Sequence, residues 1–133
     1  RPEVAAVAAG GQDSVGVRCP AHPVSQALLV AARALGVPGV AAPSANRFGR
    51  VSPTTAAHVA EEFADLGDEQ LLILDGGPCP VGIESTIVDC SRGMPVLMRP
   101  GMITPAQIEA VCGQPLRARD EAAPRASGTL ESH

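Results

Sequence analysis

The sequence predicts an α/β or α+β fold in which helices flank a mixed sheet. Short apolar segments of strand length alternate with longer segments of helical periodicity, and turns rich in glycine, proline and serine separate them. With 133 residues, 45% of them apolar, the chain suits one globular domain. Because Phe48 and Phe63 are its only aromatic residues, we expect an aliphatic core.

The first third of the chain is expected to hold two strands on either side of a helix. Residues 1–13 form a weak helix or loop, and residues 14–18 alternate in the manner of a strand. Apolar side chains at helical spacing predict a helix over about residues 23–35, which Gly36 ends. Residues 39–42 are expected to form a short buried strand.

A second helix is expected in the middle of the chain. Ser52 is the predicted N-cap, Pro53 takes the first helical position, and the helix runs to about Leu66. Its polar face, which we expect to point to water, carries three carboxylates: Glu61, Glu62 and Asp65.

The last part of the fold is expected to contain three strands and one helix. The strands are predicted at residues 71–75, 85–89 and 96–99. Thr104, followed three residues later by glutamine, is a capping-box pattern that opens a helix ending at Gly113.

Composition excludes several classes of function. The formal charge of −4, with no Trp or Tyr, opposes a broad nucleic-acid surface. Every residue in the Lys-plus-Arg count is Arg, so lysine is not a candidate catalytic group. The four cysteines and three histidines are scattered, which favours free thiols in a cytoplasmic protein over a metal site. No apolar run reaches the ~20 residues that span a bilayer, and the residues at the start of the sequence do not show the basic-then-apolar pattern of a signal peptide.

Two serine-centred turns carry the strongest chemical signal. Residues 42–46 (Ala-Pro-Ser-Ala-Asn) and 52–54 (Ser-Pro-Thr) enclose Arg47, Gly49 and Arg50. Hydroxyls, guanidinium groups and a permissive glycine suit the phosphates and hydroxyls of a nucleotide. Ordinary turns use the same residue types, so the pattern alone leaves both interpretations open.

Two arginines, Arg18 and Arg99, end predicted apolar strands, where ligands commonly bind in open α/β sheets. The alternative is an arginine that reaches solvent or pairs with a surface carboxylate. Residues 76–86, rich in glycine and proline and ending in Ser85 and Thr86, either line a polar pocket or form a connecting loop. Within this segment Glu84 is a solvated glutamate in preference to a general base.

Five motifs, at residues 14–23, 42–54, 74–77, 82–89 and 99–104, follow the order found in a known family. Together they make the chain resemble the YrdC/Sua5 family of threonylcarbamoyl-AMP synthases over about residues 3–115. The resemblance implies a YrdC-like twisted mixed sheet with flanking helices. It also implies synthesis of L-threonylcarbamoyl-adenylate and pyrophosphate from L-threonine, bicarbonate and ATP with Mg²⁺, for a transferase that modifies adenosine 37 of tRNA.

The resemblance also implies the roles of individual residues. ATP contacts fall to four polar residues, Ser14, Ser44, Ser52 and Arg99. Threonine contacts fall to Arg18, the backbone of Ala42, and Ser85, with Asn46 shaping the pocket. No residue is assigned as a catalytic acid, base or metal ligand.

Against the family, the chain reads as a synthase domain incomplete at its N-terminus. Residues 1–115 match the C-terminal part of that domain, and residues 116–133 match the start of an interdomain linker. The N-terminal remainder would carry further strands and a basic phosphate-binding motif. Two alternatives remain open, a module that binds double-stranded RNA and an inactive truncated product.

Overall fold

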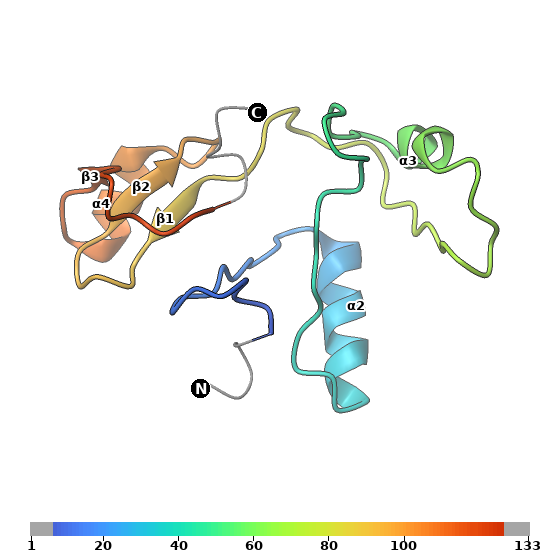
Figure 1. The fold of residues 1–133 in the computed structure, drawn as a ribbon, viewed down its shortest axis with the longest axis horizontal. Helices are drawn as coiled ribbons and strands as arrows, with labels where there is room; N and C mark the ends of the chain where they lie inside the picture. The colour runs from blue at the N-terminus through green and yellow to red at the C-terminus, as the bar shows by residue number, and fades with distance from the viewer. Residues whose placement is uncertain (1–6, 127–133) are drawn as a thin grey trace. The chain divides into compact units, whose positions relative to one another are not determined.

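The computed structural model describes residues 7–126, which divide into two compact units. The sheet unit comprises Arg1–Gly16 and Val81–His133, of which residues 7–16 and 81–126 are described. The helical unit comprises Val17–Pro80. Figure 1 shows the strands in the first unit and the helices α2 and α3 in the second.

A small mixed sheet organises the sheet unit. Strand β1 (Ile87–Asp89) is antiparallel to β2 (Val96–Arg99), and β2 is parallel to β3 (Arg117–Ala118). Helix α4 (Pro105–Cys112) forms the connection between the two parallel strands. The mixed α/β class is therefore confirmed, and so are the strands predicted at residues 85–89 and 96–99, the first in shortened form.

Helix α4 begins and ends where its local sequence predicts. The Thr104 N–H donates to Gln107 Oε1 at 2.9 Å, and the Gln107 N–H donates to Thr104 Oγ1 at 3.4 Å. These reciprocal bonds complete the predicted capping box. Gly113 ends the helix in the left-handed region at φ +68°, which suits a residue without a Cβ.

Part of the segment predicted to be a linker belongs to the sheet. Besides the β2–β3 pairing, the Arg117 N–H donates to the Pro95 carbonyl at 3.0 Å. The Arg125 N–H donates to Gln12 Oε1 at 2.7 Å, and Gln12 Nε2 donates back to the Arg125 carbonyl. An open strand edge accepts an extended backbone whatever its side chains, so polar composition did not reveal this pairing. The role of residues 116–133 as a linker stays a prediction, and residues 127–133 lie outside the described residues.

Helix α2 (Pro23–Ala34) agrees with its prediction to within one residue. Pro23 occupies the first helical position, where a missing N–H costs nothing, and His22 Nδ1 accepts from the Val24 N–H at 3.3 Å. Gly36 then leaves the helix at φ +82°. His22 thus has a structural role as the N-cap of α2.

Helix α3 (Ala56–Glu62) is shorter than predicted, and its predicted N-cap is wrong. Thr55 takes that position in place of Ser52, because its side chain accepts from the His58 N–H at 3.2 Å. The helix ends at Glu62, four residues before the predicted end at Leu66. Ser52 and Thr55 are both good caps, and the sequence pattern did not separate them.

Three predicted strands are absent from the structure. Residues 14–18, 39–42 and 71–75 carry no strand, although all of them are described. Val40 is 55% exposed, so the prediction that residues 39–42 are buried is wrong. Leu72, in residues 71–75, is 79% exposed. A strand needs a neighbour that satisfies its N–H and C=O groups, and within residues 7–126 these three segments pair with no strand.

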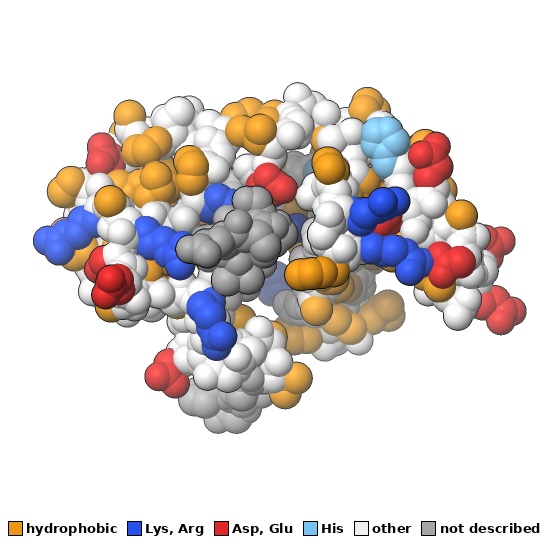
Figure 2. Space-filling model, turned by 45° about the horizontal axis from the view of Figure 1, so that its top comes forward, with side chains coloured by type: hydrophobic (Ala, Val, Ile, Leu, Met, Phe, Trp, Pro, Cys, Tyr) orange, Lys and Arg blue, Asp and Glu red, His pale blue; other side chains and the backbone are white. Residues whose placement is uncertain are grey.

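The buried core is small and lies mainly in the sheet. Ala9, Val96 and Met98 are buried there, and Pro95 and Asp89 are buried as well. Figure 2 shows many hydrophobic side chains on the viewed surface. No helix in the described part of the chain has the length and apolarity to cross a membrane.

Candidate functional site

The sheet unit brings together two residues that the sequence assigned to different substrates. Arg99, at the end of β2, donates through Nε to the Ser85 carbonyl at 3.0 Å and through Nη2 to the same oxygen at 2.9 Å. Nη2 also lies 3.3 Å from Ser85 Oγ. A planar guanidinium can make such a fork to one carbonyl, whereas an ammonium group cannot. The predicted ATP ligand and the predicted threonine ligand are therefore in direct contact.

Backbone packing holds the Ser85 segment on a second side. A Cβ added to Gly101 would lie 2.6 Å from the Glu84 carbonyl oxygen, 2.8 Å from the Ser85 carbonyl carbon, and closer still to the Thr86 nitrogen. The Thr86 hydroxyl also donates to the Ile103 carbonyl at 2.8 Å. Residues 84–86 and 99–103, which belong to two of the five sequence motifs, thus form one packed unit.

An ion-pair network fixes the turn between β1 and β2. Asp89 Oδ1 accepts from the Ser91 hydroxyl at 2.7 Å and from the Ser91 N–H at 2.8 Å, and Arg92 Nε donates to Asp89 Oδ2 at 3.0 Å. Arg92 Nη1 in turn contacts Asp120 at 2.9 Å. The Ser91 hydroxyl, followed by the Ser91 N–H and Arg92, holds the pKa of Asp89 below its usual range despite burial. This buried carboxylate is a structural anion.

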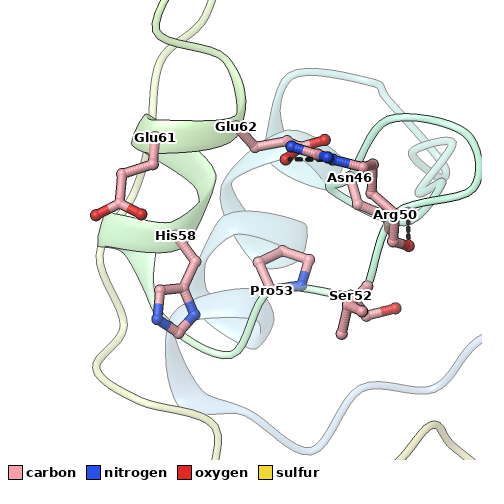
Figure 3. A pocket seen from close by; sticks show the side chains of 8 residues that line it. Asn46, Arg50, Ser52, Pro53, His58, Glu61 and Glu62 are labelled. Carbon is pink, nitrogen blue, oxygen red and sulfur yellow. Dashed lines mark hydrogen bonds and ion pairs between the residues drawn. The ribbon is translucent and has the colours of Figure 1, made fainter.

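The helical unit contains a polar pocket of about 300 Å³ beside α3. Figure 3 shows Ser52, Pro53 and Arg50 on the loop before the helix, with the Arg50 side chain directed at Glu62 of the helix. His58 and Glu61, also on the helix, complete the lining. Arg50 Nε lies 3.5 Å from Glu62 Oε2. Hydroxyl and guanidinium donors suit a phosphate, whereas the carboxylates repel one. Glu62 neutralises the positive charge of Arg50, and this pairing opposes phosphate binding in the pocket.

Asn46 lines this pocket, while the pocket-shaping role that the family resemblance implies for it stays a prediction. Its Nδ2 donates to the Arg50 carbonyl at 2.9 Å and to the Arg47 carbonyl at 3.0 Å, which closes residues 46–50 into a loop. Asn46 Oδ1 is buried and meets no donor within the described residues. A buried acceptor without a donor costs about 1–3 kcal/mol, so this oxygen is the pocket atom most in need of one.

The same loop is attached to α3 by contacts that the sequence reasoning missed. The Arg47 N–H donates to Glu62 Oε1 at 3.1 Å, and its guanidinium pairs with Asp65 and lies 5.4 Å from the centre of the Phe63 ring. The prediction that Glu62 faces water is therefore wrong, since its side chain is 16% exposed, whereas Asp65 is exposed as predicted and also pairs with Arg47. One signal was present: Arg47 and Arg50 are three residues apart, and so are the two carboxylates.

The remaining predicted site residues are distributed over both units. Ser14 is half-buried in the sheet unit, whereas Arg18, Ala42 and Ser44 are exposed in the helical unit. Arg18 and Ala42 lie on segments without regular secondary structure, which the sequence had assigned to strands. The structure thus groups Ser85 with Arg99, and Asn46 with Ser52, while the ligand assignments stay predictions.

The other candidate groups show no clustering that suggests a metal centre. Within residues 7–126, no group of three or more His, Cys, Asp or Glu is placed to hold a metal ion. Cys19, Cys79, Cys90 and Cys112 are free and exposed. His58 Nδ1 lies 3.4 Å from both the Thr54 nitrogen and hydroxyl, a contact at its own helix N-terminus.

Comparison with known proteins agrees with the family resemblance that the five sequence motifs carry. The model of the Sua5/YciO/YrdC family, described as telomere recombination, matches residues 1–101. The threonylcarbamoyl-AMP synthase of Bacillus subtilis (strain 168) is 50% identical over 103 residues, 77% of this chain and 28% of that protein. The synthase of Pyrococcus abyssi (strain GE5 / Orsay) is 44% identical over 108 residues, 81% of this chain and 30% of that protein.

Solved structures give the same result. The crystal structure of P. abyssi Sua5 complexed with L-threonine matches with a TM-score of 0.70 and 39% identity, over 92% of this chain and 34% of that chain. The H234A/Y235A variant of P. abyssi Sua5 also matches with a TM-score of 0.70, at 40% identity over 91% of this chain and 33% of that chain. The chain spans less than a third of the length of the two curated relatives above.

Proposed function

The chain belongs to the Sua5/YciO/YrdC family, and on that premise we propose that it forms part of a threonylcarbamoyl-AMP synthase. The reaction joins L-threonine, bicarbonate and ATP into threonylcarbamoyl-adenylate and releases pyrophosphate and water; the threonine amine and bicarbonate first form the carbamate N-carboxythreonine, which releases the water. The observation that carries the proposal is the 50% identity to a threonylcarbamoyl-AMP synthase, sustained over 103 residues. The likeness to a Sua5 structure that contains L-threonine supports threonine as a substrate.

The chemistry asks for alignment and charge neutralisation more than for a catalytic acid or base. A carbamate oxygen of N-carboxythreonine attacks the α-phosphorus of ATP, a new P–O bond forms, and the bond to pyrophosphate breaks. Positioned hydroxyls and guanidinium groups can supply most of the rate in such a transfer. The inventory of this chain, with Ser44, Ser52, Ser85 and Arg99 in its motifs, fits that demand.

Magnesium enters this proposal as part of the substrate MgATP. Mg²⁺ at nucleotide sites is held largely by phosphate oxygens and water, with one or two protein carboxylates at most. The described residues do not fit a dedicated all-protein magnesium site, because they contain no suitable cluster of ligands. The product would pass to a tRNA threonylcarbamoyl transferase, and we propose a cytoplasmic location for both proteins.

A chimeric synthase tests the function directly. The 103 matched residues of this chain would replace their counterparts in the B. subtilis enzyme, to which they are 50% identical. Pyrophosphate release from ATP should then require both threonine and bicarbonate. A chimera that folds as the parent enzyme does but releases no pyrophosphate under these conditions would contradict the proposal.

The 133-residue chain provides a second measurement. Calorimetric titration with L-threonine and with MgATP measures which substrate contacts this part of the synthase supplies. D-threonine is the matched control, because it has the same composition and charge with the opposite configuration. Binding of both enantiomers with equal affinity would indicate a non-specific site and would count against a threonine subsite in this chain.

A further inference from the structure

We propose that Arg99 is a positioning residue for threonine, acting through Ser85, in addition to the role toward ATP that its motif implies. This inference rests on the proposed synthase function. It starts from the forked contact in which Nε and Nη2 of Arg99 both donate to the Ser85 carbonyl, at 3.0 and 2.9 Å. A guanidinium engaged in this way determines where the Ser85 backbone lies.

The Ser85 hydroxyl is oriented by the same group. Nη2 lies 3.3 Å from Ser85 Oγ and donates to it, so the hydroxyl oxygen acts there as an acceptor. A hydroxyl that accepts in one direction keeps its own hydrogen for donation in another. Arg99 therefore prepares Ser85 as a donor, which is the polarity that a carboxylate ligand such as that of threonine requires.

Two further contacts make this arrangement rigid. Gly101 packs its α-carbon against the backbone of residues 84–86, at a distance that admits no side chain. The Thr86 hydroxyl donates to the Ile103 carbonyl at 2.8 Å. The segment that carries Ser85 is thus held by the guanidinium, by a backbone contact and by a hydrogen bond, all from residues 99–103. Binding of a ligand at Arg99 would consequently change the affinity of Ser85 for its ligand, and the reverse.

Replacement of Arg99 by lysine separates the two roles. Lysine keeps the positive charge that ATP phosphates need but cannot donate two parallel bonds to one carbonyl. We expect Arg99→Lys to lower the affinity for threonine about tenfold, which is the loss expected for one hydrogen bond to a charged group. The affinity for ATP should fall less. Arg117→Lys on the neighbouring strand β3 is the matched control and should leave both affinities unchanged.

A double-mutant cycle tests whether Arg99 acts through Ser85. Ser85→Ala should lower the threonine affinity by itself. In the Ser85→Ala background, Arg99→Lys should lower it little further, because both changes remove the same oriented hydroxyl donor. Fully additive effects would overturn the coupling. So would an Arg99→Lys variant that loses ATP affinity but keeps threonine affinity.

A readout without substrate keeps the inference distinct from the proposed function. In ¹⁵N-labelled 133-residue chain, the amide resonances of Ser85 and Thr86 should shift in Arg99→Lys and stay in place in Arg117→Lys. Unchanged amides in Arg99→Lys would refute the positioning role whether or not substrates bind. A folded chimera that releases no pyrophosphate would instead refute the proposed function, while the amide shifts would still decide whether Arg99 holds Ser85.

Discussion

Substitution of Gly101 by alanine tests the packing that holds the Ser85 segment. The new methyl group would meet the Glu84 carbonyl oxygen at 2.6 Å and the Ser85 carbonyl carbon at 2.8 Å, and would lie closer still to the Thr86 nitrogen. All three are backbone atoms, so no rotamer change relieves the overlap, and residues 84–86 must move by several tenths of an ångström. Overpacking of this kind costs about 1–3 kcal/mol.

A matched substitution isolates the steric term. Gly82 lies in the same unit, has no atom within 4 Å of an added Cβ, and has an ordinary backbone conformation. Gly82→Ala should be neutral or stabilise by about 0.4–1 kcal/mol, since alanine restricts the unfolded chain. Urea unfolding followed by far-UV circular dichroism measures both variants, because the chain has no Trp or Tyr. A Gly101→Ala variant as stable as Gly82→Ala would refute the close approach.

Three further predictions concern the caps and ion pairs. Thr104→Ala removes the capping box of α4 and should lower the free energy of unfolding by about 0.5–2 kcal/mol in the same urea assay; no change would contradict the cap. Because the pKa of Asp89 is lowered in the folded state, its contribution is present at neutral pH and is lost as the pH falls below about 4. Urea unfolding from pH 7 to pH 3 should therefore show a smaller acid loss in Asp89→Asn than in wild type, and equal losses would count against it. Glu62→Gln removes the charge that pairs with Arg50, whose side chain is 70% exposed, but keeps a side-chain oxygen that can accept from the Arg47 N–H, so the loss should stay below about 1 kcal/mol, with Glu61→Gln as control. A larger loss would contradict a weak Arg50–Glu62 ion pair.

The helices show how far local sequence signals reach. The capping box at Thr104, the glycine at residue 113 and the proline at residue 23 each act on atoms within a few residues, so their effects follow from the sequence. The prediction of the α3 N-cap failed because Ser52 and Thr55 offer equivalent hydroxyls three residues apart. Local chemistry identified the cap type but not the position.

The candidate site was predicted in part. The order of motifs selected Ser85 and Arg99 as ligands, yet nothing in their spacing of 14 residues indicated that they touch. Arg47 and Glu62 were missed because an ion pair across 15 residues depends on how the loop returns to the helix. Such contacts are decided by chain reversal, which periodicity does not encode.

By itself, the sequence determined the presence of the helices, the capping box of α4, the two antiparallel strands and the family, because each depends on contiguous residues or on motif order. Tertiary structure decided which extended segments became strands: residues 117–118 did so despite their polar surroundings, and residues 39–42 and 71–75 did not despite their apolar side chains. The physical reason is that a strand exists only where a neighbour satisfies its backbone hydrogen bonds, whereas a helix satisfies its own.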